Sequence, residues 1–177
     1  MSDHQPIVCI INPDNIVIDV NQAWDYFALQ NDCPKSTRIG VLEKSILDAV
    51  SGKVTKQYWR DLLARAWLST QPLKIDYRCD SPDTKRWMQM ELCRLEDGNM
   101  RISHIQLASE KRTPAIHFKL ASQRSSSTHI RCSICNRLKE NNHWHEAETL
   151  IKTGNNAGSV YLPVIYGVCT DCGTKKI

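Results

Sequence analysis

Four cysteines near the end of this 177-residue chain form two closely spaced pairs, Cys132 with Cys135 and Cys169 with Cys172. In each Cys-x-x-Cys pair, a tight turn directs two sulfur atoms toward one ion at about 2.3 Å. Two such turns complete a tetrahedron, and four sulfur ligands leave no open position for a catalytic water. We therefore predict one structural zinc ion, Zn²⁺, on these four thiolates.

The remaining cysteines are single, which separates them from the paired set. They are Cys9, Cys33, Cys79 and Cys93. The segment around the pairs has few apolar side chains, so it needs a cross-link that a metal supplies. An iron centre, either mononuclear or an iron–sulfur cluster, a redox-active dithiol and a site without metal are the alternatives to zinc.

The two pairs are separated by 33 residues that carry structure of their own. The spacing of four apolar residues predicts a short helix that Gly154 ends. These residues are Trp144, Ala147, Leu150 and Ile151. A strand is expected over 161–168, and Gly173 directly after the second pair suits a turn that needs a permissive backbone.

Composition limits the class of protein. Hydrophobic residues make up 41% and charged residues 24%, and no apolar run approaches the roughly 20 residues of a membrane span. The first ten residues lack a basic stretch before an apolar segment, so we expect no signal peptide, a cytoplasmic location and no membrane partner. The net charge of +4 is spread along the chain, which does not favour a nucleic-acid surface.

The first two thirds of the sequence predict an α+β domain. A hairpin is expected from strands at 7–11 and 15–20, followed by a helix that Asn21 caps, a short helix over 42–50 and a long helix over 54–69. Three strands then follow, in which apolar residues alternate with polar ones. This order predicts helices on one face of a five-stranded antiparallel sheet.

Several short motifs in this region resemble those of bacterial PAS sensory domains. They are Val20-Asn21-Gln22-Ala23-Trp24, Asp76 to Pro82, Arg86-Trp87-Met88 and Ile102-Ser103-His104. The resemblance covers about residues 7–107 and implies a PAS-like fold. We therefore expect a PAS-like sensory domain over 1–107, a flexible linker over 108–128 and a zinc-binding module over 129–177, because the linker contains proline, charges and a serine tract.

The C-terminal module has a resemblance of its own. Besides the two cysteine pairs, it carries Arg137-Leu138-Lys139, Trp144, Glu148 and Tyr166-Gly167-Val168. Together these residues resemble a cysteine-rich tail that follows PAS or response-regulator modules in bacterial signalling proteins. The resemblance implies a role in signalling and adds no catalytic residue.

The PAS resemblance also indicates a ligand pocket and an interface. The pocket would be lined by residues on the packed face of the sheet, although ordinary core packing explains the same residues. They are Tyr77, Cys79, Met88, Met90, Met100 and His104. The ligand is unknown, and the pocket can equally be empty. Trp87 points away from the packed face, which favours a contact with a partner protein or with a second copy in a homodimer.

These observations favour a signalling protein over an enzyme, because the sequence contains no nucleophile elbow, phosphate-binding loop or kinase signature. The expected function is sensing of a small ligand or docking of a partner by the PAS-like domain, with a zinc module that presents a protein-interaction surface. One alternative is a transcriptional regulator whose module binds nucleic acid through five basic residues, and another is a redox switch of the thiols. The basic residues are Arg131, Arg137, Lys139, Lys175 and Lys176.

Overall fold

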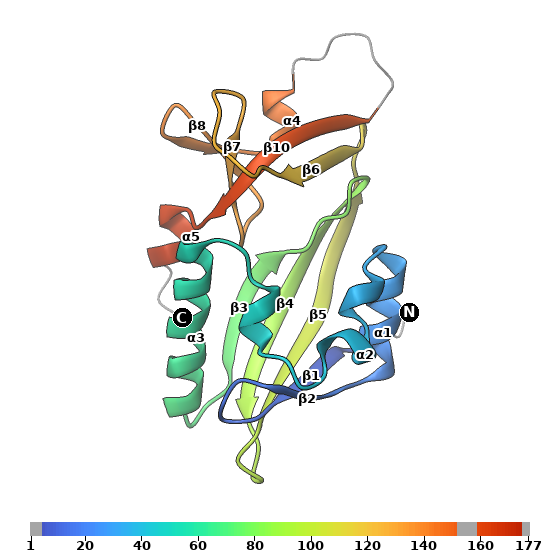
Figure 1. Cartoon of the computed structure of the whole chain (residues 1–177), viewed down its shortest axis with the longest axis vertical. Coiled ribbons are helices and arrows are strands. Elements are labelled where there is room, and N and C mark those ends of the chain that lie inside the picture. Colours follow the sequence, from blue (N-terminus) through green and yellow to red (C-terminus); the bar gives the residue numbers. More distant parts are fainter. Residues whose placement is uncertain (1–4, 152–158, 175–177) are drawn as a thin grey trace.

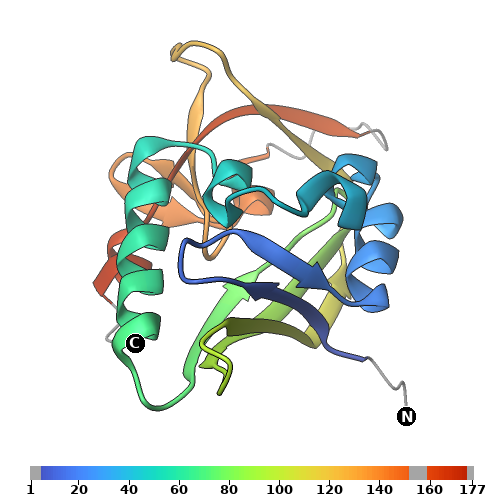
Figure 2. The same ribbon diagram turned by 60° about the horizontal axis from the view of Figure 1, so that its bottom comes forward.

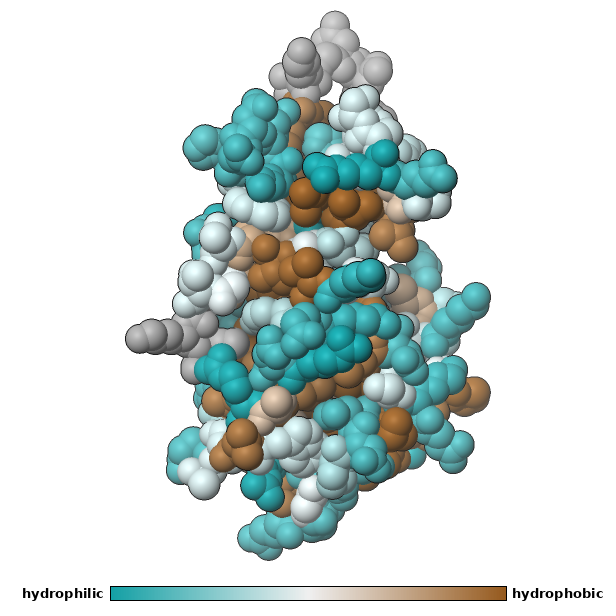
Figure 3. All heavy atoms as spheres, turned by 60° about the vertical axis from the view of Figure 1, so that its left-hand side comes forward, coloured by the Kyte–Doolittle hydropathy of each residue, from teal (hydrophilic) through white to brown (hydrophobic). Residues whose placement is uncertain are grey.

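The computed structural model describes residues 5–151 and 159–174, which form two five-stranded β-sheets. The first sheet and its helices make up the lower part of Figure 1, and the second sheet lies above them. Hydrophilic side chains cover most of the face seen in Figure 3, and hydrophobic ones show between them in separate patches. None of the helices in these ranges combines the length and apolar character that crossing a membrane requires.

The first sheet is antiparallel throughout, with the strand order β2-β1-β5-β4-β3. Its strands are β1 (Ile7–Ile11), β2 (Val17–Val20), β3 (Leu73–Arg78), β4 (Thr84–Arg94) and β5 (Met100–Lys111). The chain leaves the sheet at the β2 edge and returns at the β3 edge, so the connecting helices must cross the sheet. This arrangement confirms the predicted α+β, PAS-like fold.

The crossing consists of helices that lie on one face of the first sheet (Figure 2). They are α1 (Gln22–Gln30), η1 (Pro34–Ser36), α2 (Arg38–Val41), η2 (Ile46–Ala49) and α3 (Lys53–Leu68). The side chain of Asn21 accepts hydrogen bonds from the backbone N–H of Trp24 at 3.0 Å and of Val8 at 3.1 Å. The predicted cap therefore also fixes the start of α1 to strand β1.

The prediction of a single helix over 42–50 was wrong. The structure has α2 before this range and η2 within it, separated by Glu43 in the left-handed region with φ of 61°. The backbone there bonds to the segment before and within β2, since Glu43 N–H donates to Val17 O at 2.9 Å and Ile46 N–H donates to Asn15 O at 3.0 Å. These bonds replace those that a continuous helix would make.

The hydrophobic core lies between α3 and the packed face of the first sheet. The predicted stripe of α3 is confirmed, because Leu62, Leu63 and Ala66 are buried and two tryptophans pack half-buried beside them. The predicted alternation of the strands is confirmed as well. Buried strand residues of this core include Cys9, Ile11, Ile75, Met90, Leu92, Met100 and Ile102.

The second sheet is mixed, with the order β6-β10-β7-β8-β9. Its strands are β6 (Ile116–Leu120), β7 (His129–Cys132), β8 (Leu138–Glu140), β9 (His143–His145) and β10 (Val160–Gly167). Strand β10 is parallel to both of its neighbours and matches the strand predicted over 161–168. The predicted helix is confirmed only as α4 (Ala147–Leu150), because Trp144 belongs to β9, and Gly154 lies outside the described residues.

The segment 108–128, expected to be a flexible linker, contains the end of β5 and the whole of β6, whereas its residues 121–128 lie outside helices and strands. Strand β5 continues to Lys111, and β6 supplies an edge strand of the second sheet. Arg112 is 5% exposed and Ile116 only 1%. Composition misled here because the polar groups find partners within the fold, as when Arg112 N–H donates to Asp83 O and Ile116 N–H to Pro82 O, both at 2.8 Å.

We predict that Ile116→Ala lowers the free energy of unfolding by about 2–5 kcal/mol, because it leaves a cavity in the core of the second sheet. The matched control is Leu120→Ala on the same strand, where the side chain is 62% exposed, and its cost is expected within about 0.5 kcal/mol. Urea unfolding measures both. Equal, small effects would show that this segment is a linker after all.

Candidate functional site

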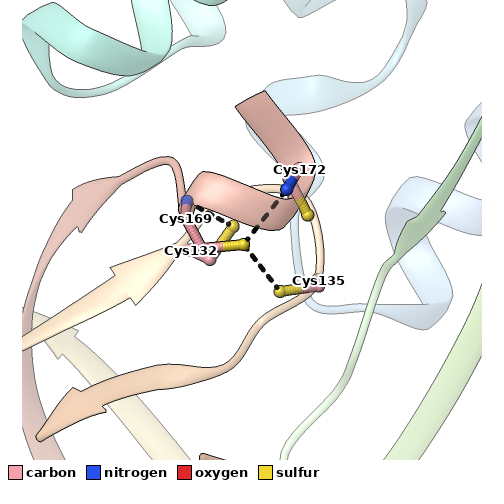
Figure 4. A group of neighbouring side chains, drawn as sticks. All are labelled: Cys132, Cys135, Cys169 and Cys172. Carbon is pink, nitrogen blue, oxygen red and sulfur yellow. Dashed lines mark hydrogen bonds between the residues drawn. The ribbon is translucent and has the colours of Figure 1, made fainter. Parts of the chain in front are cut away.

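The four paired cysteines converge on one point at the end of the second sheet nearest α3 (Figures 1 and 4). Their four Sγ atoms all lie within 4.8 Å of one another, and the Sγ atoms of Cys135 and Cys169 are 3.7 Å apart. A tetrahedral ion with sulfur ligands at about 2.3 Å separates those ligands by about 3.8 Å. The described geometry therefore fits one thiolate-bound metal ion, as predicted from the spacing.

Backbone hydrogen bonds shape the first cysteine turn. Asn136, with φ of 62°, occupies the left-handed region and donates its N–H to Cys132 O at 3.0 Å. Asparagine tolerates this conformation better than most residues. The permissive backbone position expected at Gly173 is therefore found at Asn136, because Gly173 lies in the short helix α5 (Thr170–Thr174) with φ outside the left-handed region.

Two of the sulfur atoms accept hydrogen bonds from backbone N–H groups. Cys169 N–H donates to the Sγ of Cys132 at 3.3 Å, and Cys172 N–H donates to the Sγ of Cys169 at 3.4 Å. Hydrogen bonds from the Cys135 and Cys172 thiols, with help from backbone N–H groups, lower the pKa of Cys132, and the same contacts with Cys132 raise the pKa of Cys135 and the pKa of Cys172. Cys132 and Cys169 are fully buried, so an ion bound here would have little contact with water.

The first cysteine turn also bonds directly to the first sheet, at the edge of β3 that pairs with no other strand. Arg78 N–H donates to Ile134 O at 2.7 Å, and the Asn136 side chain donates to Arg78 O at 3.2 Å. The hydroxyls of Thr55, on α3, and Ser133 are 2.9 Å apart. The turn thus covers a strand edge that would otherwise have free backbone groups.

A buried carboxylate, Asp80, lies beside this contact and bonds two arginines. Its side chain is 1% exposed, and its Oδ2 is 2.7 Å from Arg78 Nη2 and 2.8 Å from Arg112 Nη2. The same arginines form ion pairs with the module, Arg78 with Glu146 at 3.4 Å and Arg112 with Glu148 at 2.8 Å. We call Asp80, these two arginines and these two glutamates the junction network.

Burial alone would raise the pKa of Asp80, but the hydrogen bond and charge of Arg78 outweigh it and hold that pKa below the usual value. Asp80 therefore stays ionised in the folded protein. Sequence reasoning did not identify the junction network, because its bonded partners are up to 68 residues apart and each looks like an ordinary surface charge.

The predicted pocket residues divide into three groups. Tyr77, Cys79 and His104 line one cavity of about 410 Å³, together with Trp24 and other residues. Met88 lines a neighbouring cavity of about 490 Å³, which His104 also borders. Met90 and Met100 belong instead to the packed core, with exposed fractions of 4% and 0%. Ligand binding at the first group stays a prediction.

His104 is one of the polar residues that line this pocket. Its Nδ1 lies 2.9 Å from the hydroxyl of Tyr77, and the two rings meet edge to face. Burial lowers the pKa of His104 to about 4 and raises the pKa of Tyr77. Both side chains are therefore uncharged at neutral pH.

Trp87 lies on the outer face of the first sheet, as predicted, and is 37% exposed. The guanidinium of Arg78 stacks over its ring at 4.8 Å. Leu107, on the neighbouring strand, is 56% exposed. Trp87 and Leu107 line a groove of about 430 Å³ whose other wall includes Cys135 and Cys172 of the cysteine site.

No protein-family profile matches the chain, and no curated protein matches it in sequence. Among solved structures, a sensory box histidine kinase from Vibrio cholerae is 13% identical with a TM-score of 0.42, covering 59% of this chain and 82% of its own. The PAS domain of the RpfR receptor from Cronobacter turicensis, in complex with C12:0, is 7% identical with a TM-score of 0.45, covering 61% and 99%.

A third similar structure is the PAS domain of an HTR-like protein from Haloarcula marismortui, which is 14% identical with a TM-score of 0.40 and covers 59% of this chain and 84% of its own. These scores are low, so the PAS-like description of this chain rests on its own strand order and crossing helices.

We predict that the purified chain contains one tetrahedral metal ion, expected to be zinc, and that Cys169→Ser removes it, because three sulfur ligands leave the site open. Elemental analysis gives the metal content. Cys33→Ser is the control, since Cys33 is an exposed cysteine outside the cluster. Iron in place of zinc, or metal loss under mild oxidant, would contradict structural zinc.

We further predict that Asp80→Asn lowers the free energy of unfolding by about 3–5 kcal/mol at neutral pH, because it removes the buried partner that both arginines share and leaves them only the partly exposed Glu146 and Glu148. Since the folded-state pKa of Asp80 is lowered, the wild type keeps this contribution above about pH 4 and loses it as the pH falls further.

The matched control for this variant is Asp76→Asn, which changes an exposed carboxylate on β3 and is expected to cost less than about 1 kcal/mol. Chemical unfolding between pH 3 and pH 7, by circular dichroism, measures both variants. A small effect of Asp80→Asn at pH 7 would show that the junction network does not hold the module.

Proposed function

We propose that this chain is a signalling protein in which the PAS-like sheet and the C-terminal module together form a docking surface for another protein. The module, here called the cysteine module, comprises residues 129–151 and 159–174 of the described chain. The observation that carries the proposal is the groove shared by Trp87 and the cysteine site. One wall comes from the outer face of the first sheet and the other from the module. A structural zinc ion would fix the second wall.

The shape and chemistry of the groove suit a protein partner. Trp87 and Leu107 provide exposed apolar area, and charged groups surround them, among them Lys85 and Arg137. A partly exposed tryptophan inside a polar rim is typical of a binding hot spot. A second copy of this chain is one candidate partner, and a separate signalling protein is the other.

Coupling between the two walls supports a role in signal transmission. The junction network and the Arg78 N–H···O bond to Ile134 link the sheet to the cysteine turn. A ligand that moved β3 would therefore move the module as well. Because a ligand can shift an equilibrium only by binding one state better, the signal would be a change in how well the groove fits its partner.

Binding of nucleic acid through the module has less support. Arg131 is 9% exposed, and Arg137 forms ion pairs with Asp171 at 3.5 Å and with Glu146 at 3.8 Å. Phosphate contacts require exposed cations without such partners. Of the five expected basic residues, Arg131 is therefore buried and Arg137 is already paired with carboxylates at the surface, and Lys175 and Lys176 lie outside the described residues.

The test is sedimentation of the purified protein and capture of partners on the immobilised full chain. We predict that Trp87→Ala weakens self-association or partner capture at least about tenfold, as for a binding hot spot, and that Cys172→Ser does the same by opening the metal site. Tyr161→Ala is the control, because Tyr161 is 56% exposed on β10 and does not line the groove.

Identical binding by the wild type and Trp87→Ala would contradict the proposal. A salt-dependent gel shift with duplex DNA that Trp87→Ala leaves unchanged would replace it with nucleic-acid binding.

A further inference from the structure

A separate cavity of about 480 Å³ lies where the helical layer of the first sheet meets the cysteine module. One side is formed by η2, α1 and α3, with Trp24, Thr55 and Trp59 in its wall. The other side is formed by the module, with Arg131 and Tyr166. The volume falls in the range of roughly 300–1,000 Å³ typical of small-molecule sites.

Arg131, on β7, is the unusual residue of this wall. It is 9% exposed, and its buried Nε has no hydrogen-bond partner. The guanidinium stacks at 3.9 Å on the ring of Phe118, and the phenol oxygen of Tyr166 accepts a hydrogen bond from it. Within residues 5–151 and 159–174, no carboxylate lies in ion-pair distance of Arg131. A buried cation without a counter-ion is costly, so binding of an anion beside Arg131 would be favourable.

The other charges at this cavity do not compensate Arg131. Asp80 is the carboxylate in the wall, but its Oδ2 is already bonded to Arg78 and Arg112. Arg78 also lines the cavity, and its charge is matched by Asp80. His104 is uncharged because its burial keeps it deprotonated. The lining therefore carries one unmatched positive charge, which suits a monoanion better than a dianion.

The other lining residues indicate what the uncharged part of such a ligand would be. Trp24 and Trp59 offer aromatic faces, and Ile46 and Val50 add apolar surface. The planar guanidinium of Arg131, whose residue lines the cavity, presents paired N–H donors that match the two oxygens of a carboxylate.

We propose that this cavity binds a small aromatic monocarboxylate, whose carboxylate pairs with Arg131 and whose ring lies against Trp24 and Trp59. The site uses residues of both modules, so binding would bridge them next to the hydroxyl contact between Thr55 and Ser133. Only the effect of binding on signalling rests on the proposed function. The site itself rests on the cavity and on Arg131.

The test is calorimetric titration of the full-length, metal-loaded chain with phenylacetate and indole-3-acetate. At least one of these acids should bind with a dissociation constant below about 1 mM. The matching uncharged amides, phenylacetamide and indole-3-acetamide, should bind at least about tenfold more weakly, because they lack the charge that pairs with Arg131. Absence of binding by both acids, or equal binding of acids and amides, would overturn the proposal.

Variants locate the site. Arg131→Met should weaken acid binding at least about tenfold, and Arg131→Lys, which keeps the charge but loses the planar donor pair, should weaken it as well. Arg101→Met, which removes a surface guanidinium from β5, should leave binding unchanged. A melting curve shows whether each variant is folded. If Arg131→Met does not fold, the binding measured with Arg131→Lys still tests the site.

Unchanged binding by folded Arg131 variants would overturn the site. Because these titrations use the isolated chain without a partner, their failure is distinct from a failure of the docking groove, which Trp87→Ala tests.

Discussion

The bond between Asp80 and its two arginines is the interaction on which the relation of the two sheets depends. Asp80 is nearly inaccessible to water, so its charge must be matched inside the protein. Arg78 and Arg112 match it, and their remaining donors reach Glu146 and Glu148 of the module. Each arginine thus pairs with the buried Asp80 and with one glutamate of the module. The network therefore links the first sheet to the module through both arginines.

The cysteine site and the junction network act on the same few residues. The cysteine turn places Ile134 O where Arg78 N–H can bond to it, and Asn136 bonds the adjacent carbonyl of Arg78. A metal ion on the four sulfur atoms would hold this turn in shape without a large hydrophobic core. The groove at Trp87 and the cavity at Arg131 both depend on this contact, because each has one wall from the PAS-like domain and one from the cysteine module.

Local patterns in the sequence predicted the elements well. The alternation of apolar and polar residues predicted the packed face of β3, β4 and β5. The helical spacing of apolar residues predicted α3, and the Cys-x-x-Cys spacing predicted the sulfur cluster. Each of these signals lies within a short stretch of chain. The segment 108–128 was misjudged because its composition is polar, whereas its partners, among them Asp80 and Glu148, are distant in sequence. Ion pairs of that kind carry no periodicity, so pattern reasoning could not find them.

We infer that the first sheet and the module form one rigid body. Residual dipolar couplings of backbone amides in the metal-loaded protein measure this. A single alignment tensor should fit the couplings of β1 to β5 together with those of β6 to β10. Two tensors of different magnitude or orientation would show instead that the module moves independently of the sheet.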